Sequence, residues 1–100
     1  MAGGGSLSVP FAAEIDSMLK RGKVDLSRLL YIASKSPADD RAQAMIGREL
    51  FRQEDFENAL YYLTKARDIV KERISKFASH DDIMEFSRLV REIEEVQERI

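Results

Sequence analysis

The sequence predicts a small all-α protein, an antiparallel bundle of four to five helices. From Pro10 onward, apolar residues recur at the three-and-four spacing of an amphipathic helix, and no stretch alternates apolar and polar residues as a half-buried strand does. At 100 residues the chain is long enough for one core and too short for two. Its composition, 44% hydrophobic and 34% charged, is typical of a globular protein with a charged surface.

Residues 1–9 are interpreted as a flexible tail or an expression-linker remnant. This segment contains three consecutive glycines and a serine at positions 3–6, and glycine loses the most conformational entropy on ordering. Residues 10–100 are predicted to form a single helical domain. Within it we distinguish two short helices over 10–35 and a three-helix unit over 36–100.

Start and stop signals bound the two short helices. Pro10 suits the first position of one helix, which Gly22 ends. Asp25 can cap the next helix, which ends before Pro37 because the residue preceding proline is pushed out of the helical region. The apolar faces comprise Phe11, Ile15, Met18 and Leu19 in the first helix and Leu26, Leu29, Leu30 and Ala33 in the second.

The third helix has a strong start signal. Ser36 can cap it, Pro37 fits its first turn, and Asp39 and Asp40 place negative charge at the positive end of the helix dipole. The apolar face comprises Ala42, Met45, Ile46 and Leu50. The polar run 52–55 then turns the chain, and its last residue is the expected cap of the following helix.

Two longer helices complete the chain. One is predicted over 56–77, and Ser79 followed three residues later by Asp82 is a capping signal for the last. The stripe of the first comprises Phe56, Leu60, Leu63, Val70, Ile74 and Phe77, and that of the second Ile83, Phe86, Val90, Ile93 and Ile100, widened by Leu89 and Val96. Short connections predict that neighbouring helices are antiparallel.

Small and bulky residues alternate over residues 40–74 in a recognisable pattern: Ile46-Gly47, Leu50, Phe56, Ala59, Leu63 and Ala66. Residues with little or no side chain at 47, 59 and 66 allow two helix axes to approach closely. This stretch resembles one tetratricopeptide repeat (TPR), with Glu54 where that family usually has a turn glycine. No second copy follows at the family's spacing of about 34 residues, so the resemblance implies one TPR-like hairpin with extra helices.

Residues 40–100 also resemble the three-helix microtubule-interacting-and-transport (MIT) domain, which shares the hairpin pattern of Phe56 and Ala59. In that family a peptide docks between helices. Both resemblances imply an adaptor that binds a peptide or helix of a protein partner in an interhelical groove. Some TPR proteins clamp a chaperone's terminal carboxylate with a Lys and an Asn, but Ala44 and Arg48 stand at those places, so binding of that kind is not predicted. The expected partner contacts are Arg48, Phe51, Tyr61 and Tyr62, since rigid aromatics with polar tips are frequent interface anchors.

Two alternatives remain open at this point. The last helix could form a homodimer through a seam that resembles a coiled coil, unless its stripe packs within the chain. The candidate self-association residues are Ile83, Phe86, Leu89, Val90, Ile93 and Val96. The helix over 56–77 could instead bind RNA or anionic lipid through a basic face, unless that face pairs with the acidic last helix. The basic residues are Lys65, Arg67, Lys71, Arg73 and Lys76, and the acidic ones Glu92, Glu94, Glu95 and Glu98.

The composition argues against catalysis and cofactors. The chain has no Cys and a single His, His80, which excludes thiolate chemistry, a His pair for a metal and a supported triad. The acidic residues after it are interpreted as the first turn of a helix. A net charge of -2 argues against bulk binding to nucleic acid. With no apolar run of about 20 residues and no signal peptide, the expected location is cytoplasmic. We therefore predict a non-enzyme without catalytic, cofactor-binding or metal-binding residues.

Overall fold

The computed structural model describes residues 11–100, and this part of the chain is all α-helical, as predicted. The described residues form no strand. Their helices are α1 (Ala12–Arg21), α2 (Leu26–Lys35), α3 (Asp40–Arg52), α4 (Phe56–Lys76) and α5 (His80–Arg99). The interpretation of residues 1–9 as a tail, and of Pro10 as a first helical residue, falls outside the described residues.

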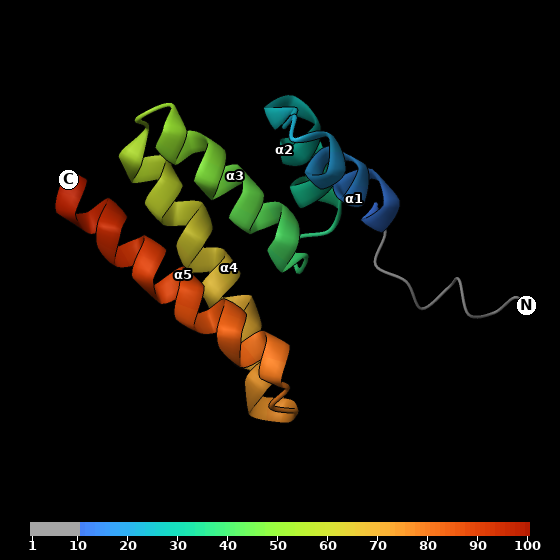
Figure 1. Cartoon of the computed structure of the whole chain (residues 1–100), viewed down its shortest axis with the longest axis vertical. Helices are drawn as coiled ribbons and strands as arrows, with labels where there is room; N and C mark the ends of the chain where they lie inside the picture. Colours follow the sequence, from blue (N-terminus) through green and yellow to red (C-terminus); the bar gives the residue numbers. More distant parts are fainter. Residues whose placement is uncertain (1–10) are drawn as a thin grey trace, which may run out of the picture.

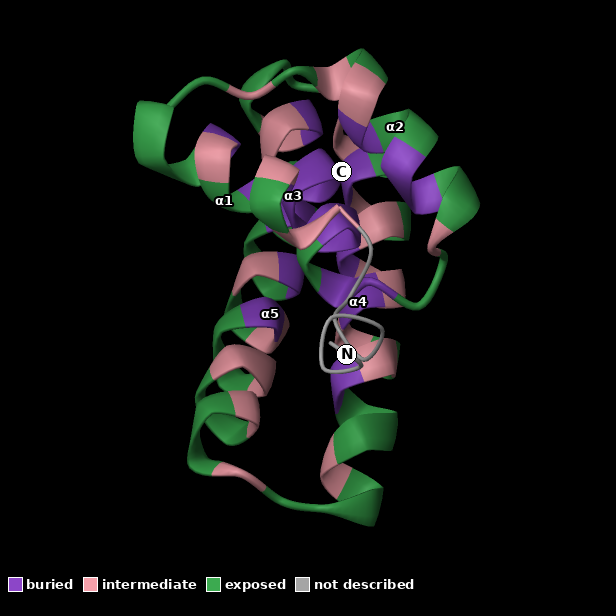
Figure 2. Ribbon diagram, turned by 90° about the vertical axis from the view of Figure 1, so that its right-hand side faces the viewer, coloured by how far each residue is buried: buried purple, intermediate pink, exposed green. Residues whose placement is uncertain are grey.

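From α2 onward consecutive helices pack against one another, and α3, α4 and α5 run antiparallel (Figure 1). The α4 helix lies against both α3 and α5, and α2 packs on α3 (Figure 1). Figure 2 shows α1 and α5 toward one side of the molecule and α2 and α4 toward the other. The end of α5 lies near the α3–α4 turn, whereas the α4–α5 turn projects from the opposite end of the hairpin (Figure 1).

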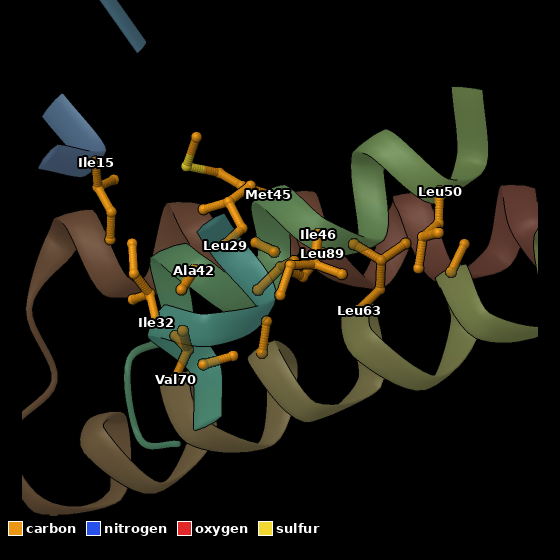
Figure 3. Packing of buried hydrophobic residues seen from close by; sticks show 14 of the residues in the cluster. Ile15, Leu29, Ile32, Ala42, Met45, Ile46, Leu50, Leu63, Val70 and Leu89 are labelled. Carbon is orange, nitrogen blue, oxygen red and sulfur yellow. The ribbon is translucent and has the colours of Figure 1, made fainter. Parts of the chain in front are cut away.

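All five helices contribute side chains to one hydrophobic core (Figure 3). The largest fully buried apolar side chains are Ile15, Leu29, Ile32, Ile46, Leu63, Val70, Leu89 and Val96. Full burial of an aliphatic side chain of this size contributes about 1.5–3 kcal/mol. All of these buried side chains except Ile32 belong to the predicted apolar stripes, whereas five other stripe residues are exposed: Leu19, Leu30, Phe77, Ile83 and Ile100.

Three predicted helix boundaries are confirmed. Asp25 caps α2 by accepting a hydrogen bond from the backbone N–H of Arg28 at 3.2 Å. Ser79 caps α5 by accepting one from the N–H of Asp82 at 3.1 Å. Gly22 ends α1 with φ of 68°, a left-handed conformation that favours glycine.

The predicted cap of α3 was wrong. Asp39, not Ser36, caps the helix: one of its carboxylate oxygens accepts from the N–H groups of Arg41, at 3.1 Å, and Ala42, at 3.3 Å. The N–H of Ser36 donates to the carbonyl of Ile32 at 2.8 Å and closes the last turn of α2. Ser36 thus belongs to the preceding helix.

Pro37 is likewise not in the first turn of α3, which begins at Asp40. Pro37 lies in the turn between α2 and α3, where its carbonyl accepts a hydrogen bond from the buried side chain of Gln43 at 3.2 Å. That bond satisfies the amide nitrogen of Gln43, whereas its buried Oε1 accepts no hydrogen bond among the described residues.

The α3–α4 turn and the end of α4 also differ in detail from the prediction. Asp55 precedes α4 as expected, but its side chain accepts from the side chain of Asn58 at 2.9 Å and makes no cap to the backbone. Glu54 has φ of 63°, the left-handed conformation for which glycine is usual. The last residue of α4 is Lys76, because Phe77 is already extended.

The predicted close approach of α3 and α4 is confirmed. Ala59 and Ala66 of α4 are completely buried. A Cβ atom placed on Gly47 would lie 2.7 Å from Cγ of Leu63 and 3.1 Å from its backbone nitrogen. Since real Cβ atoms do not approach other heavy atoms at 2.7 Å, the missing side chain of Gly47 allows the two helices to pack at this distance.

Candidate interaction groove

A groove of about 430 Å³ lies between α1, α3 and α5. We call its apolar lining the floor: Leu19, Val24, Met45, Phe51, Leu63 and Val96. We call its charged lining the rim: Arg48, Glu49, Arg52, Arg88, Glu92 and Glu95. Figure 3 shows Met45 and Leu63 among the packed side chains of the hydrophobic core. The groove is therefore apolar at its base and charged at its edges.

Helical spacing brings these residues to one face of each helix. On α3 the lining positions are 45, 48, 49, 51 and 52, and on α5 they are 88, 92, 95 and 96. Positions three and four apart share a helix face. Leu19, at the end of α1, is the floor residue that α1 contributes, and it is 56% exposed.

Arg48 joins α3 to α5 across this region. Its Nε donates to Oε2 of Glu92 at 2.9 Å, and its Nη2 donates to Oε1 of Glu92 at 2.9 Å and to Glu85 at 3.2 Å. Burial lowers the pKa of Arg48, but the hydrogen bonds and charges of Glu92 and Glu85 outweigh that effect, so the pKa is raised. A bidentate guanidinium–carboxylate contact of this kind fixes the relative orientation of the two side chains in addition to pairing their charges. Arg48 therefore stays charged and holds α5 against α3.

A second ion pair lies within one turn of α3. The side chain of Arg52 donates to one oxygen of Glu49, and Gln53 donates to the other at 3.1 Å. The hydrogen bond from Arg52 holds the pKa of Glu49 below its ordinary value. Glu49 is thus ionised at neutral pH, and both of its carboxylate oxygens already accept hydrogen bonds from Arg52 and Gln53.

The four predicted partner contacts do not form one site. Arg48 and Phe51 line the groove. Tyr61 and Tyr62 lie on α4 outside its lining and pack edge to face with ring centroids 5.0 Å apart. Tyr61 is 55% exposed, and the Lys65 ammonium lies 5.2 Å from its ring centroid. The two tyrosines belong to a different surface of the molecule.

Several lining residues escaped the sequence-based prediction, notably Leu19, Val24, Arg52 and Arg88. Leu19 was expected on the buried face of its helix. No local pattern distinguishes it, because its exposure depends on where α1 sits relative to α5. One signal for Arg52 was available in the sequence: it lies four positions after Arg48, and residues four apart share a helix face.

The candidate self-association residues divide between core and surface. Leu89, Ile93 and Val96 are buried in the intrachain core. Phe86 and Val90 are half-buried, and Ile83 is exposed near the α4–α5 turn. The outward face of α5 is charged and exposed; it carries Arg88, Arg91, Glu94, Glu95 and Glu98.

The expected pairing of the basic face of α4 with the acidic end of α5 was wrong. Arg73 instead donates to Asp82 at the start of α5 and to Asp40 of α3, both at 2.9 Å. Glu92 pairs with Arg48 of α3. The reason is geometric: α4 and α5 are antiparallel, so the start of α5 lies beside the end of α4 (Figure 1).

Two other basic residues of α4 are paired within their own helix, whereas Lys65 and Lys71 have no ion pair among the described residues. Arg67 pairs with Asp68 at 3.0 Å, and Lys76 with Glu72 at 3.5 Å. The carboxylates interleaved on the same helix reduce the positive potential that a phosphate-binding surface requires.

Residues 11–100 contain no cluster of three or more His, Asp or Glu side chains that could hold a metal ion. Among these residues, no helix combines the length and apolar character needed to span a membrane. No protein-family profile, curated protein or solved structure matches the chain.

Proposed function

We propose that this chain is a protein–protein interaction module that binds a peptide or short helix of a partner in the groove between α1, α3 and α5. The observation that carries the proposal is the groove itself, which has a volume of about 430 Å³, an apolar floor and a charged rim. Apolar pockets with a few polar groups at their edges are the usual form of a binding site. The resemblance of residues 40–74 to a TPR hairpin and of 40–100 to an MIT domain supports the same function.

Leu19 offers a direct test because it is exposed in the free protein. A partner side chain in the groove would cover it and gain the burial energy of an apolar contact. A random-peptide display library selected on the full chain would supply ligands, and isothermal titration would measure their affinity. Leu19→Gln should weaken binding by about 1 kcal/mol, roughly fivefold.

Leu30→Gln is the matched control. Leu30 is also an exposed leucine, at 40%, and lies on the adjacent helix α2 outside the groove lining. Circular dichroism should give both variants the helix content of the parent chain. If Leu30→Gln weakened binding as much as Leu19→Gln, or if no selected peptide were sensitive to Leu19, the groove would not be the binding site.

Self-association is a second candidate function, favoured by one specific observation. Apolar side chains are exposed around the α4–α5 turn: Phe77 at 76%, Met84 at 59% and Ile83 at 45%. Contiguous exposed apolar residues often mark an interaction site. Sedimentation equilibrium over a range of concentrations tests this directly. A mass of 11.4 kDa throughout would refute it, whereas a dimer that Met84→Gln dissociates would support it.

A further inference from the structure

The charged residues of the rim differ in how much of their hydrogen-bonding capacity is used. Both oxygens of Glu92 accept from Arg48, and each oxygen of Glu49 has its own donor, Arg52 of α3 or Gln53 just after it. The carboxylates of Glu49 and Glu92 are therefore largely satisfied within the chain. Glu95 is the rim carboxylate with no ion pair among the described residues.

The rim arginines have N–H groups that are not used in hydrogen bonds among the described residues. A guanidinium group has five N–H donors. Arg48 uses Nε and Nη2, and no hydrogen bond within residues 11–100 involves its Nη1. Arg52 and Arg88 are exposed, and each pairs with one carboxylate of its own helix, Arg88 at 3.5 Å from Glu92. The groove can thus donate to several additional acceptors.

Further positive charge lies at the α1 end of the groove. Lys20, Arg21 and Lys23 are exposed and adjoin Leu19 and Val24 in the sequence, and Arg21 and Lys23 line a separate pocket that shares Val24 with the groove. No ion pair within the described residues occupies these three side chains. Unpaired positive charge beside this end of the groove favours an acidic ligand over a basic one.

We infer that the ligand of the groove is an acidic amphipathic segment of a partner protein. Its apolar side chains would cover the floor, and its Asp or Glu carboxylates would accept from Arg48, Arg52 and Arg88. The apolar floor favours a protein segment over a nucleic acid, whose backbone offers phosphates but no aliphatic side chains. This inference rests on the proposed function, because it specifies the chemistry of the ligand in the same groove.

The peptide selection on the full chain also tests the ligand's charge. We expect the selected peptides that are sensitive to Leu19→Gln to contain more Asp and Glu than Lys and Arg. Peptides enriched in Lys and Arg, or without a charge preference, would overturn the inference and leave groove binding intact. Absence of any peptide sensitive to Leu19 would overturn both.

Variants of the rim then test which residues read that charge. The double variant Arg52→Gln and Arg88→Gln should bind a selected acidic peptide about tenfold more weakly, since an exposed ion pair contributes up to about 1 kcal/mol. Arg91→Gln is the control, because Arg91 is an exposed arginine of α5 outside the groove lining.

Salt provides an independent readout in the same titrations. Raising it from about 0.05 M to 0.5 M should weaken the parent complex several-fold and the double variant much less, because exposed charges are screened. Two results would show that the rim arginines do not bind the ligand's carboxylates. One is a loss of affinity in the Arg91→Gln variant as large as in the double variant. The other is a salt dependence that is the same in the parent chain and the double variant.

Discussion

Replacing Gly47 with alanine is expected to destabilise the protein, although alanine is the better helix former. Inside a helix, alanine is favoured over glycine by about 1 kcal/mol. The new Cβ, however, would lie 2.7 Å from Cγ and 2.9 Å from Cδ2 of Leu63. It would also lie 3.1 Å from the backbone nitrogen of Leu63, so a side-chain rotation alone does not relieve the clash.

The expected loss follows from these two opposing terms. Overpacking a close-packed core costs about 1–3 kcal/mol, and contact with a helix backbone places this case in the upper half of that range. Subtracting the gain in helix propensity leaves a loss of about 1–2 kcal/mol. With a urea dependence of about 1–3 kcal/mol per molar, the unfolding midpoint should fall by roughly 0.3–2 M.

Urea unfolding followed by circular dichroism measures this loss, and Leu63→Ala supplies the control. That substitution alone should cost about 2–5 kcal/mol because it leaves a cavity. In its background, Gly47→Ala should cost less than in the parent chain, or stabilise, since most of the colliding atoms are gone. A stabilising effect in the parent, or the same loss in both backgrounds, would refute the argument from close approach.

Two further predictions concern stability. Asp39→Ala should cost about 0.5–2 kcal/mol because it removes the α3 cap, while Asp39→Ser should lose less because it can still accept from the backbone; equal urea midpoints for the two variants would contradict the cap. The hydrogen bond from Arg73 holds the pKa of Asp82 below its ordinary value of 3.8. The ionised Asp82 therefore stabilises the folded state fully above that value, and this contribution is lost as the pH falls through the lower folded-state pKa. Asp82→Asn should therefore reduce the loss of stability below about pH 4, whereas the neighbouring Asp81→Asn should not; identical acid unfolding curves for these two variants would count against the Arg73 contact.

Much of the fold could be predicted from the sequence because its determinants are local. The amphipathic stripes predicted the number and the approximate ends of the helices. Gly47, Ala59 and Ala66 predicted where α3 and α4 come close. The cap of α3 was misassigned because Ser36 and Asp39 both suit the role, and only the closing hydrogen bond of α2 on Ser36 decides between them.

The groove could be predicted only in part because it depends on contacts distant in the chain. Arg48 was identified as a contact residue, but its partner Glu92 is 44 residues away. Tyr61 and Tyr62 satisfy the general preference for aromatics at interfaces but lie on another surface. The contribution of Leu19 depends on the position of α1, which no local spacing encodes.

The order of the helix contacts bears on how the protein moves. The three most extensive interfaces join neighbours in the chain, α2 with α3, α3 with α4, and α4 with α5, whereas α1 has no interface of similar extent. Such local topology is typical of folding within microseconds to milliseconds. Since segments with fewer contacts open at lower free energy, the amides of α1 should exchange with solvent before those of α3 and α4. Because Leu19 of α1 lines the groove, local opening of α1 would remove one side of the lining while α3, α4 and α5 stay folded.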